Sequence, residues 1–234
     1  MLPFIGQPVL RLRPLHSHDS LSSESDKIPH SVTRAYEQKA RAESAAETRR
    51  RILDGVYECL REEPSTPPSV GEIARRAGVA RSTVYLVFGS RAGLFDAFAQ
   101  ELWERSGLPN LQEAVNVPDA REGILGGIRA GVDIFAADRD VFNALFAMTK
   151  LDPDVVGGAV ERIEGRRAKG MAWGSRRLAR QKQLKPGVSA ARAAHVLWLM
   201  ASFDAFDLLY TGRGLSARET GRLLAVTFEN AVCT

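Results

Sequence analysis

Cysteine and histidine are scarce in this chain of 234 residues, which holds two cysteines and four histidines. Cys59 falls on the apolar face of a predicted helix, and Cys233 lies at the C-terminal end, which we expect to be frayed. Two such residues do not make a disulfide framework, so a reducing compartment such as the cytoplasm is expected. Only His195 follows the first thirty residues. This distribution predicts neither a His-based metal cluster nor a Ser-His catalytic triad.

The short motifs that bind cofactors are missing as well. The sequence contains no GxxxxGKS or GxxxxGKT phosphate loop, no GxGxxG after a predicted strand and no CxxC pair. We therefore predict no cofactor, no metal and no enzymatic activity. A helical enzyme that uses paired carboxylates such as Asp204 and Asp207 remains the alternative, although such pairs usually face solvent or cap neighbouring groups.

Long hydrophobic runs are also absent. The most apolar stretch, 196–210, includes Asp204 and Asp207, so no membrane span and no membrane partner are predicted. At the N-terminus, Pro3 and Pro8 interrupt a short apolar run that no early basic residue precedes. This is not the pattern of a secretory signal.

Strand patterns are missing, and helix formers are abundant. Runs of β-branched residues are short, Ala, Leu, Arg and Glu dominate, and 44% of the residues are hydrophobic, which is enough for a core. The composition predicts an all-α fold, which we divide into about nine helices. Residues 1–43 are expected to form a flexible tail because of their prolines and the polar run HSHDSLSSES, although helix-prone residues from Ser31 could extend the first helix.

The most informative stretch is 69–95, which predicts two short helices joined by a tight turn and followed by a third. Ser69 and Glu72 form an S-x-x-E capping box at the first helix. Gly78 suits a turn of positive φ, Ala74 lets the helices cross closely, and Val84 seats the second helix. This spacing is typical of a helix-turn-helix, with a plain helical hairpin inside a bundle as the alternative.

The second helix of this unit, predicted over 81–87, carries hydrogen-bond donors on its outer face. Arg81, Ser82, Thr83 and Tyr85 suit base edges and phosphates. Residues 44–107 contain nine arginines and nine acidic residues, so this region has no net charge. Binding to double-stranded DNA would then depend on the local placement of arginines.

The stretch IARRAGVARSTVYLVFGSRAGLF resembles the DNA-binding domain of TetR-type transcriptional regulators, whose usual pattern is IA-x-x-AGVS-x-GT-x-Y-x-x-F-x-S-K-x-x-L. The chain departs from it at Ala80, Ser82 and Arg91, where the family commonly has Ser, Gly and Lys. It matches the pattern at Ile73, Ala74, Ala77, Gly78, Val79, Thr83, Tyr85, Phe88, Ser90 and Leu94.

The resemblance implies a one-component regulator, most often a repressor, that binds a palindromic operator as a homodimer and responds to a small-molecule effector. The helix-turn-helix domain would span 44–106, beginning with a helix that Ser44 and Glu47 are expected to cap. A ligand-binding and dimerisation domain would span 107–234. The residues predicted to contact DNA are Thr48, Arg49, Arg81, Ser82, Thr83, Tyr85, Ser90 and Arg91.

The second domain is predicted to contain helices over 119–136, 140–151, 152–184, 189–210 and from 216 onward, with a break at 107–110. The last two are amphipathic and suit a four-helix dimer interface, unless they only complete the core of a single chain. Bulky residues between these helices could line an apolar effector pocket, with ordinary core packing as the alternative. The predicted pocket residues are Trp103, Phe135, Phe142, Phe146, Trp173, Trp198 and Phe203.

Basic residues are concentrated in 161–185, where nine Lys and Arg residues face two glutamates. The run predicts the solvated face of a long helix, with a second nucleic-acid surface as the alternative. Two broader alternatives stay open at this point: a DNA-binding or architectural protein that senses no ligand, and a helical protein-interaction bundle without DNA function.

Overall fold

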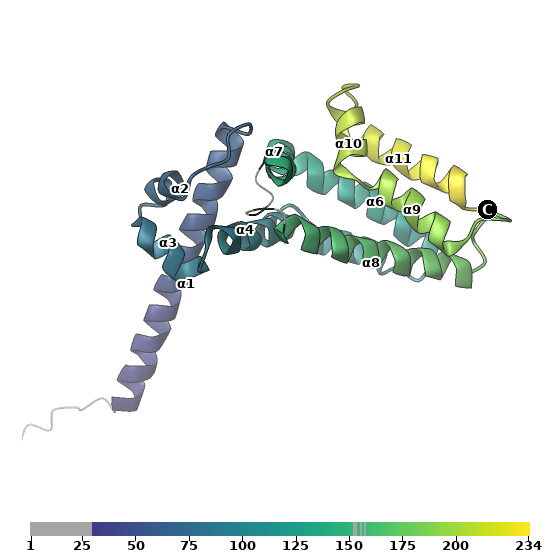
Figure 1. The fold of residues 1–234 in the computed structure, drawn as a ribbon. Coiled ribbons are helices and arrows are strands. Elements are labelled where there is room, and N and C mark those ends of the chain that lie inside the picture. Colours follow the sequence, from purple (N-terminus) through teal and green to yellow (C-terminus); the bar gives the residue numbers. More distant parts are fainter. Residues whose placement is uncertain (1–29, 152–153, 155, 157) are drawn as a thin grey trace, which may run out of the picture. The chain divides into compact units, whose positions relative to one another are not determined.

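The computed structural model describes residues 30–151, 154, 156 and 158–234 (Figure 1). The chain divides into two compact units, Met1–Glu43 and Ser44–Thr234. In the first unit, the described residues are helical from His30 onward, and an ion pair joins Lys39 to Glu43 at 4.0 Å. They form the beginning of helix α1, which runs over His30–Glu62. The other residues of the predicted tail, and the predicted helix start at Asp152 and Pro153, lie outside the described residues.

The start of the first helix differs from the prediction. Ser44 and Glu47 lie inside α1 and do not cap it, because the helix already begins at His30. The helix-prone residues that follow Ser31 continue the backbone hydrogen bonds through both positions, so Ser44 has no free helix terminus to cap. Its backbone oxygen instead accepts a hydrogen bond from Thr48 Oγ1 at 2.9 Å.

The second unit is all-helical within the part that the structure describes. The whole described chain contains eleven helices, where about nine were predicted. None of them is long and apolar enough to cross a membrane. After α1 the helices are α2 (Val70–Arg76), α3 (Arg81–Phe88), α4 (Arg91–Arg105), α5 (Leu108–Val115), α6 (Ala120–Ala137), α7 (Arg139–Leu151), α8 (Gly158–Arg180), α9 (Ala190–Met200), α10 (Phe203–Tyr210) and α11 (Ala217–Val232).

One additional helix is α5, in the place of the predicted break at 107–110. Gly107 has φ +118°, which ends α4, and Pro109 then occupies the first turn of α5, where its missing N–H costs no hydrogen bond. Glycines of α6 let α5 approach closely: a Cβ atom at Gly127 would lie 2.6 Å from Val115 Cγ1. The missing side chain at Gly127 therefore allows α5 to pack closely against α6.

The other additional helix results from a division of the predicted 189–210 helix. Ser189 caps α9 as expected, but α9 ends at Met200 and Ser202 caps α10 by accepting a hydrogen bond from the Ala205 N–H at 3.1 Å. The last helix begins where the sequence predicts, with Ser216 and Glu219 forming a full capping box. The serine caps therefore determine where these three helices begin.

The C-terminal end is held firmly, contrary to the expectation that it would fray. Cys233 is 3% exposed, and the Lys185 N–H donates to the Val232 carbonyl at 2.9 Å. Arg121 of α6 donates to Glu229 of α11 at 2.6 Å and to the Thr234 carbonyl at 2.9 Å. These bonds fasten α11 along α6, and Figure 1 shows α6, α9 and α11 side by side.

Candidate nucleic-acid interface and ligand cavity

Helices α2 and α3 form the helix-turn-helix that the spacing predicts. Ser69 Oγ accepts from the Glu72 N–H at 3.1 Å and so caps α2. Gly78 turns the chain with φ +64°, and the Val79 N–H donates to the Ala74 carbonyl at 3.0 Å. Ala74 and the α3 residue Val84 are both buried, as the prediction requires of the crossing. The turn, the cap and the packing together fix the direction of α3.

In a capping box, the Glu72 carboxylate would accept a hydrogen bond from the backbone N–H of Ser69, but here it has other partners. It accepts hydrogen bonds from Arg75 at 2.6 Å and from Arg76 at 3.0 Å, and these bonds lower the pKa of Glu72. Arg76 also forms an ion pair with Glu62 of α1 at 2.7 Å. Arg76 therefore joins α2 to α1, whereas Arg75 is bound to Glu72 within α2, so both guanidinium groups already have a carboxylate partner.

The outward face of α3 carries most of the predicted DNA contacts. Arg81, Ser82 and Tyr85 are exposed, Thr83 is half-buried, and the Arg81 guanidinium donates to the Tyr85 hydroxyl at 3.4 Å. No side chain caps α3, because Ala80 stands at the N-cap. The Thr83 N–H donates to the Ala80 carbonyl at 2.9 Å, and no side chain occupies the N-terminus of α3, which leaves it open to water or a phosphate.

One exposed residue of α3 was not among the predicted contacts. Leu86 is 86% exposed, more than the other large apolar residues that the structure shows at the surface. An apolar side chain on such a face can contact a thymine methyl group. The sequence could have indicated this exposure. Leu86 directly follows the outward-facing Tyr85 and lies away from the buried face that Val84 marks.

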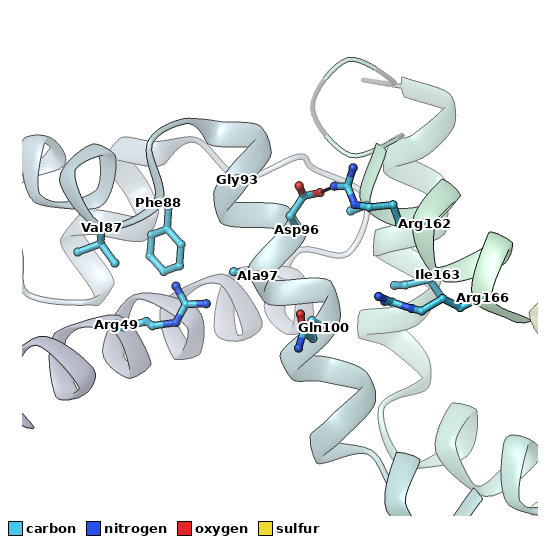
Figure 2. Close-up of a pocket in the computed structure, with 11 residues that line it drawn as sticks. Arg49, Val87, Phe88, Gly93, Asp96, Ala97, Gln100, Arg162, Ile163 and Arg166 are labelled. Carbon is cyan, nitrogen blue, oxygen red and sulfur yellow. Dashed lines mark ion pairs between the residues drawn. The ribbon is translucent and has the colours of Figure 1, made fainter. Parts of the chain in front are cut away.

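The two predicted contacts on α1 lie beside this surface. Thr48 is half-buried, and Arg49 is exposed with its guanidinium 4.8 Å from the centre of the Phe88 ring. Figure 2 shows Arg49 turned toward Phe88 at the end of α3. The cation–π contact fixes Arg49 against the recognition helix while its charge stays exposed.

Ser90 and Arg91, at the start of α4, have structural contacts of their own. Ser90 Oγ caps α4 by accepting from the Gly93 N–H at 2.9 Å. Arg91 is half-buried, donates to the Pro68 carbonyl at 3.3 Å, and lies 5.6 Å from the centre of the Phe95 ring. Both residues therefore set the position of α4 next to α2, whatever they contribute to DNA binding.

A cavity of about 610 Å³ lies between α4, α5, α6 and α8. Its walls are mostly apolar, and its polar groups are three arginines, two glutamines and one glutamate. Of the predicted pocket residues, Trp103, Phe135 and Trp173 line it. Its other apolar lining residues are Leu108, Leu111, Val115, Ile124, Ile128, Ile163, Met171, Leu197 and Ala201, together with five glycines.

The other four predicted pocket residues do not line this cavity. Phe142, Phe146 and Phe203 belong to a packed aromatic cluster, in which the Phe142 and Phe135 rings meet edge to face at 5.4 Å. Trp198 lies on α9 with 38% of its surface exposed, beneath the guanidinium of Arg167. Core packing therefore explains the three phenylalanines, as the alternative interpretation required.

A second hollow of about 430 Å³ is lined by residues of α1, α3, α4 and α8 (Figure 2). Across it, Asp96 of α4 forms an ion pair with Arg162 of α8. This hollow, called the groove below, shares three lining residues with the larger cavity: Gln100, Ile163 and Arg166. Helix α4 thus carries side chains toward α3 at one end and toward the cavity at the other.

Groups that could perform catalysis are not gathered at either hollow. Asp207, one of the paired carboxylates, accepts from Arg139 Nε at 2.7 Å and from Thr211, and the bond from Arg139 lowers its pKa. Asp204 is exposed on the same helix. Among the residues that the structure describes, no three His, Cys, Asp or Glu side chains are grouped so as to hold a metal ion.

Comparison with known proteins gives a family match in the helix-turn-helix region and matches to two transcriptional regulators. Residues 52–98 match the family described as bacterial regulatory proteins, tetR family. The chain is 32% identical over 111 residues to the HTH-type transcriptional regulator AlkX of Mycobacterium tuberculosis, a match that covers 47% of this chain and 52% of that protein. It is 38% identical over 64 residues to the HTH-type transcriptional regulator AcrR of Shigella flexneri, covering 27% of this chain and 28% of AcrR. The matched stretches thus span about half of AlkX and less of AcrR.

Solved structures extend the likeness to the fold. NalD of Pseudomonas aeruginosa, described as the secondary repressor of the MexAB-OprM multidrug efflux pump, matches with a TM-score of 0.64 and 22% identity over 80% of this chain and 98% of its own. A TetR transcription regulator from Haloarcula marismortui matches with a TM-score of 0.66 and 16% identity over 81% of this chain and 100% of its own. Residues 52–98 are thus similar to bacterial regulatory proteins of the tetR family, and the described fold is similar to that of solved TetR regulators.

Proposed function

We propose that this protein is a DNA-binding transcriptional regulator, most simply a repressor, that binds a palindromic operator as a homodimer and is modulated by a small-molecule effector. The observation that carries the proposal is the exposed donor face of α3, held in place by the buried turn of a tetR-type helix-turn-helix. It acts in the cytoplasm, where an operator is accessible.

The DNA contacts divide by chemistry. Arg81, Ser82 and Thr83, in the first turn of α3, enter the major groove and meet base edges. Tyr85, Thr48, Arg49 and the first turn of α4 contact phosphates on either side. The region 44–107 has nine arginines and nine acidic residues, so this local placement, rather than a general positive field, gives the affinity.

The dimer is proposed to form through the last helices. Large apolar side chains are exposed there: Leu199 is 59% exposed, Leu208 70% and Leu223 44%. Together with Trp198 and Val226 they occupy α9, α10 and α11, of which α10 and α11 contact α6 while α9 contacts α8 and α11. Apolar residues gathered on one side of neighbouring helices suit a two-fold interface, and two-fold pairing doubles the DNA site that one helix-turn-helix can read.

The regulatory part of the proposal depends on α4. We assign 44–106 to DNA binding and 107–234 to ligand binding and dimerisation, with α4 as the element that belongs to both. Trp103 near its C-terminal end lines the cavity, and Asp96 near its N-terminal end is paired with Arg162. An effector that fills the cavity would move α4 and change the separation of the two recognition helices.

Fluorescence anisotropy of the purified protein with DNA from just upstream of its own gene tests the proposal, with random DNA as the control and a salt titration for both. We expect a clear preference for the upstream DNA at two subunits per site. Weak, equal and steeply salt-dependent binding to both would indicate nonspecific contact only. If the protein binds neither DNA, with or without added effector candidates, the result would favour the alternative of a helical protein-interaction bundle without DNA function.

A further inference from the structure

We propose that the cavity between α4, α5, α6 and α8 binds an elongated apolar acid, and that Arg166 binds its anionic group. The regulatory meaning of this site rests on the proposed function, but ligand binding itself does not.

The cavity is long and apolar. Its α8 residues recur on one face from Ile163 to Arg177, a separation of fourteen positions that corresponds to about 21 Å of helix. Trp103, Leu111 and Ile128 contribute to the facing walls. A volume of about 610 Å³ stretched along this face suits an extended hydrocarbon body better than a compact polar molecule.

Glycines create part of the room. At Gly131 of α6 and Gly170 of α8, an added Cβ atom would meet nothing within 4 Å, in contrast to Gly127, whose neighbour Val115 lies at 2.6 Å. Glycine inside a helix costs roughly 0.5–1 kcal/mol relative to alanine. Close helix packing explains Gly127, whereas at Gly131 and Gly170 the missing side chains leave space that belongs to the cavity.

The charged groups at the walls favour an anion. Three arginines line the cavity against one glutamate, Glu104, which accepts a hydrogen bond from Gln100 at 3.0 Å. Arg167 forms an ion pair with Glu164. Arg177 donates to three backbone carbonyls of the segment between α5 and α6, those of Val115, Val117 and Pro118. Two of the three arginines are therefore already engaged.

Arg166 is different. It makes no hydrogen bond, ion pair or ring contact with any residue within the described part of the chain, although it lines both the cavity and the groove of Figure 2. Its position, one helical turn from Arg162 and facing Gln100 of α4, places a free guanidinium at one end of the apolar volume. A guanidinium in this setting binds a carboxylate through two parallel N–H···O bonds.

The position also links the ligand to α4. Arg162 is paired with Asp96, and Arg166 projects from the same side of α8 toward the same helix (Figure 2). An anion bound at Arg166 therefore adds a negative charge next to the contact that joins α8 to α4. This is the end of the cavity from which a ligand can act on the helix that begins beside the DNA surface.

Tryptophan fluorescence of the full chain provides the test, because Trp103 and Trp173 line the cavity. The probes are dodecanoate, dodecan-1-ol and dodecyltrimethylammonium, titrated below their micelle-forming concentrations without DNA. We expect dodecanoate to bind about tenfold more tightly than the alcohol, and the cation more weakly than either. Arg166→Gln is expected to remove the preference for the acid while leaving binding of the alcohol unchanged.

Two further variants sharpen the result. Arg176→Gln, an exposed arginine of α8 outside the cavity lining, is the matched control and should keep the preference. Gly131→Leu should fill the cavity and weaken both dodecanoate and dodecan-1-ol, with far-UV circular dichroism confirming that the variant is folded. Equal affinity for acid and alcohol, a preference that survives Arg166→Gln, or no binding of any probe would overturn the proposal. Operator binding is measured separately, so failure here leaves the proposed function standing.

Discussion

The helix-turn-helix region and the helices that surround the cavity use the same residue types for opposite purposes. In the first, Gly78 makes a turn of φ +64°, and Arg81 points outward. In the second, Gly131 sits inside a regular helix and leaves open space, and Arg177 turns inward onto backbone carbonyls. One region is specified by local geometry and presents its polar groups, whereas the other is specified by contacts between distant helices and encloses a volume.

The largest effect should come from the core of the second region. Phe142 is fully buried and meets Trp103 and Phe135 edge to face. Phe142→Ala is expected to reduce the free energy of unfolding by about 3–5 kcal/mol, because it leaves a cavity among the other rings. Urea denaturation followed by circular dichroism measures it, with exposed Leu151→Ala as the control. A loss below 1 kcal/mol would mean that the cluster can repack around the gap.

The next effect concerns the outward arginines. Arg81→Ala or Thr83→Ala should lower operator affinity by about 1–3 kcal/mol per lost base contact while leaving random DNA nearly unaffected. Arg91→Ala should weaken both DNAs alike and reduce the salt dependence by about one phosphate contact. Anisotropy titrations at several salt concentrations separate the two classes. Equal losses on operator and random DNA from all three variants would argue against direct readout by α3.

Glycine substitutions should change sign between positions. Gly78→Ala is expected to destabilise by about 1–2 kcal/mol, because a Cβ atom is unfavourable at φ +64°. Gly131→Ala in α6 should instead stabilise by about 0.5–1 kcal/mol, since its Cβ would enter open space. Thermal unfolding of both variants provides the measurement. If both changes shift the midpoint in the same direction, the distinction between a turn glycine and a cavity glycine is wrong.

The smallest effect is a dependence on pH. The bond from Arg139 lowers the pKa of Asp207 from its ordinary value of 3.8. The pair therefore stabilises the fold above that value, and the contribution is lost as the pH falls through the lower pKa of the folded state. Asp207→Asn should cost about 1 kcal/mol at pH 7 and less at pH 3, measured by urea denaturation at both. Asp204→Asn, an exposed neighbour, should change neither value.

The same contrast explains how much could be predicted. The limits of α2, α3 and α4 follow from Ser69, Gly78 and Ser90, because caps and turns depend on residues close in sequence. The early start of α1 is predicted only as the alternative, because Ser44 and Glu47 have the pattern of a helix cap although the helix already begins at His30. Pro109 was interpreted as a break, although it fits the first turn of α5 equally well.

The candidate sites differ in the same way. The donor face of α3 could be predicted from positions relative to Val84, whereas the cavity could be predicted only in part. Trp103 and Trp173 line it. Phe142 is equally a bulky aromatic residue of a predicted helix, but it is buried in the aromatic cluster. No local pattern distinguishes a cavity wall from a packed core, because the distinction depends on which helices meet. For the same reason, the sequence could not predict that Arg177 bonds to backbone carbonyls while Arg166 has no such partner among the described residues.

The measurement that tests the central claim most directly is selection of binding sites from random-sequence DNA by the purified protein and by its Arg81→Ala variant. We expect the wild type to enrich a palindrome whose half-sites lie about one helical turn, or a multiple of it, apart. The variant should lose preference at one symmetric pair of positions and keep the others. Enrichment of no sequence by the wild type, or of the same sequence by both proteins, would contradict the claim that the outward face of α3 reads DNA.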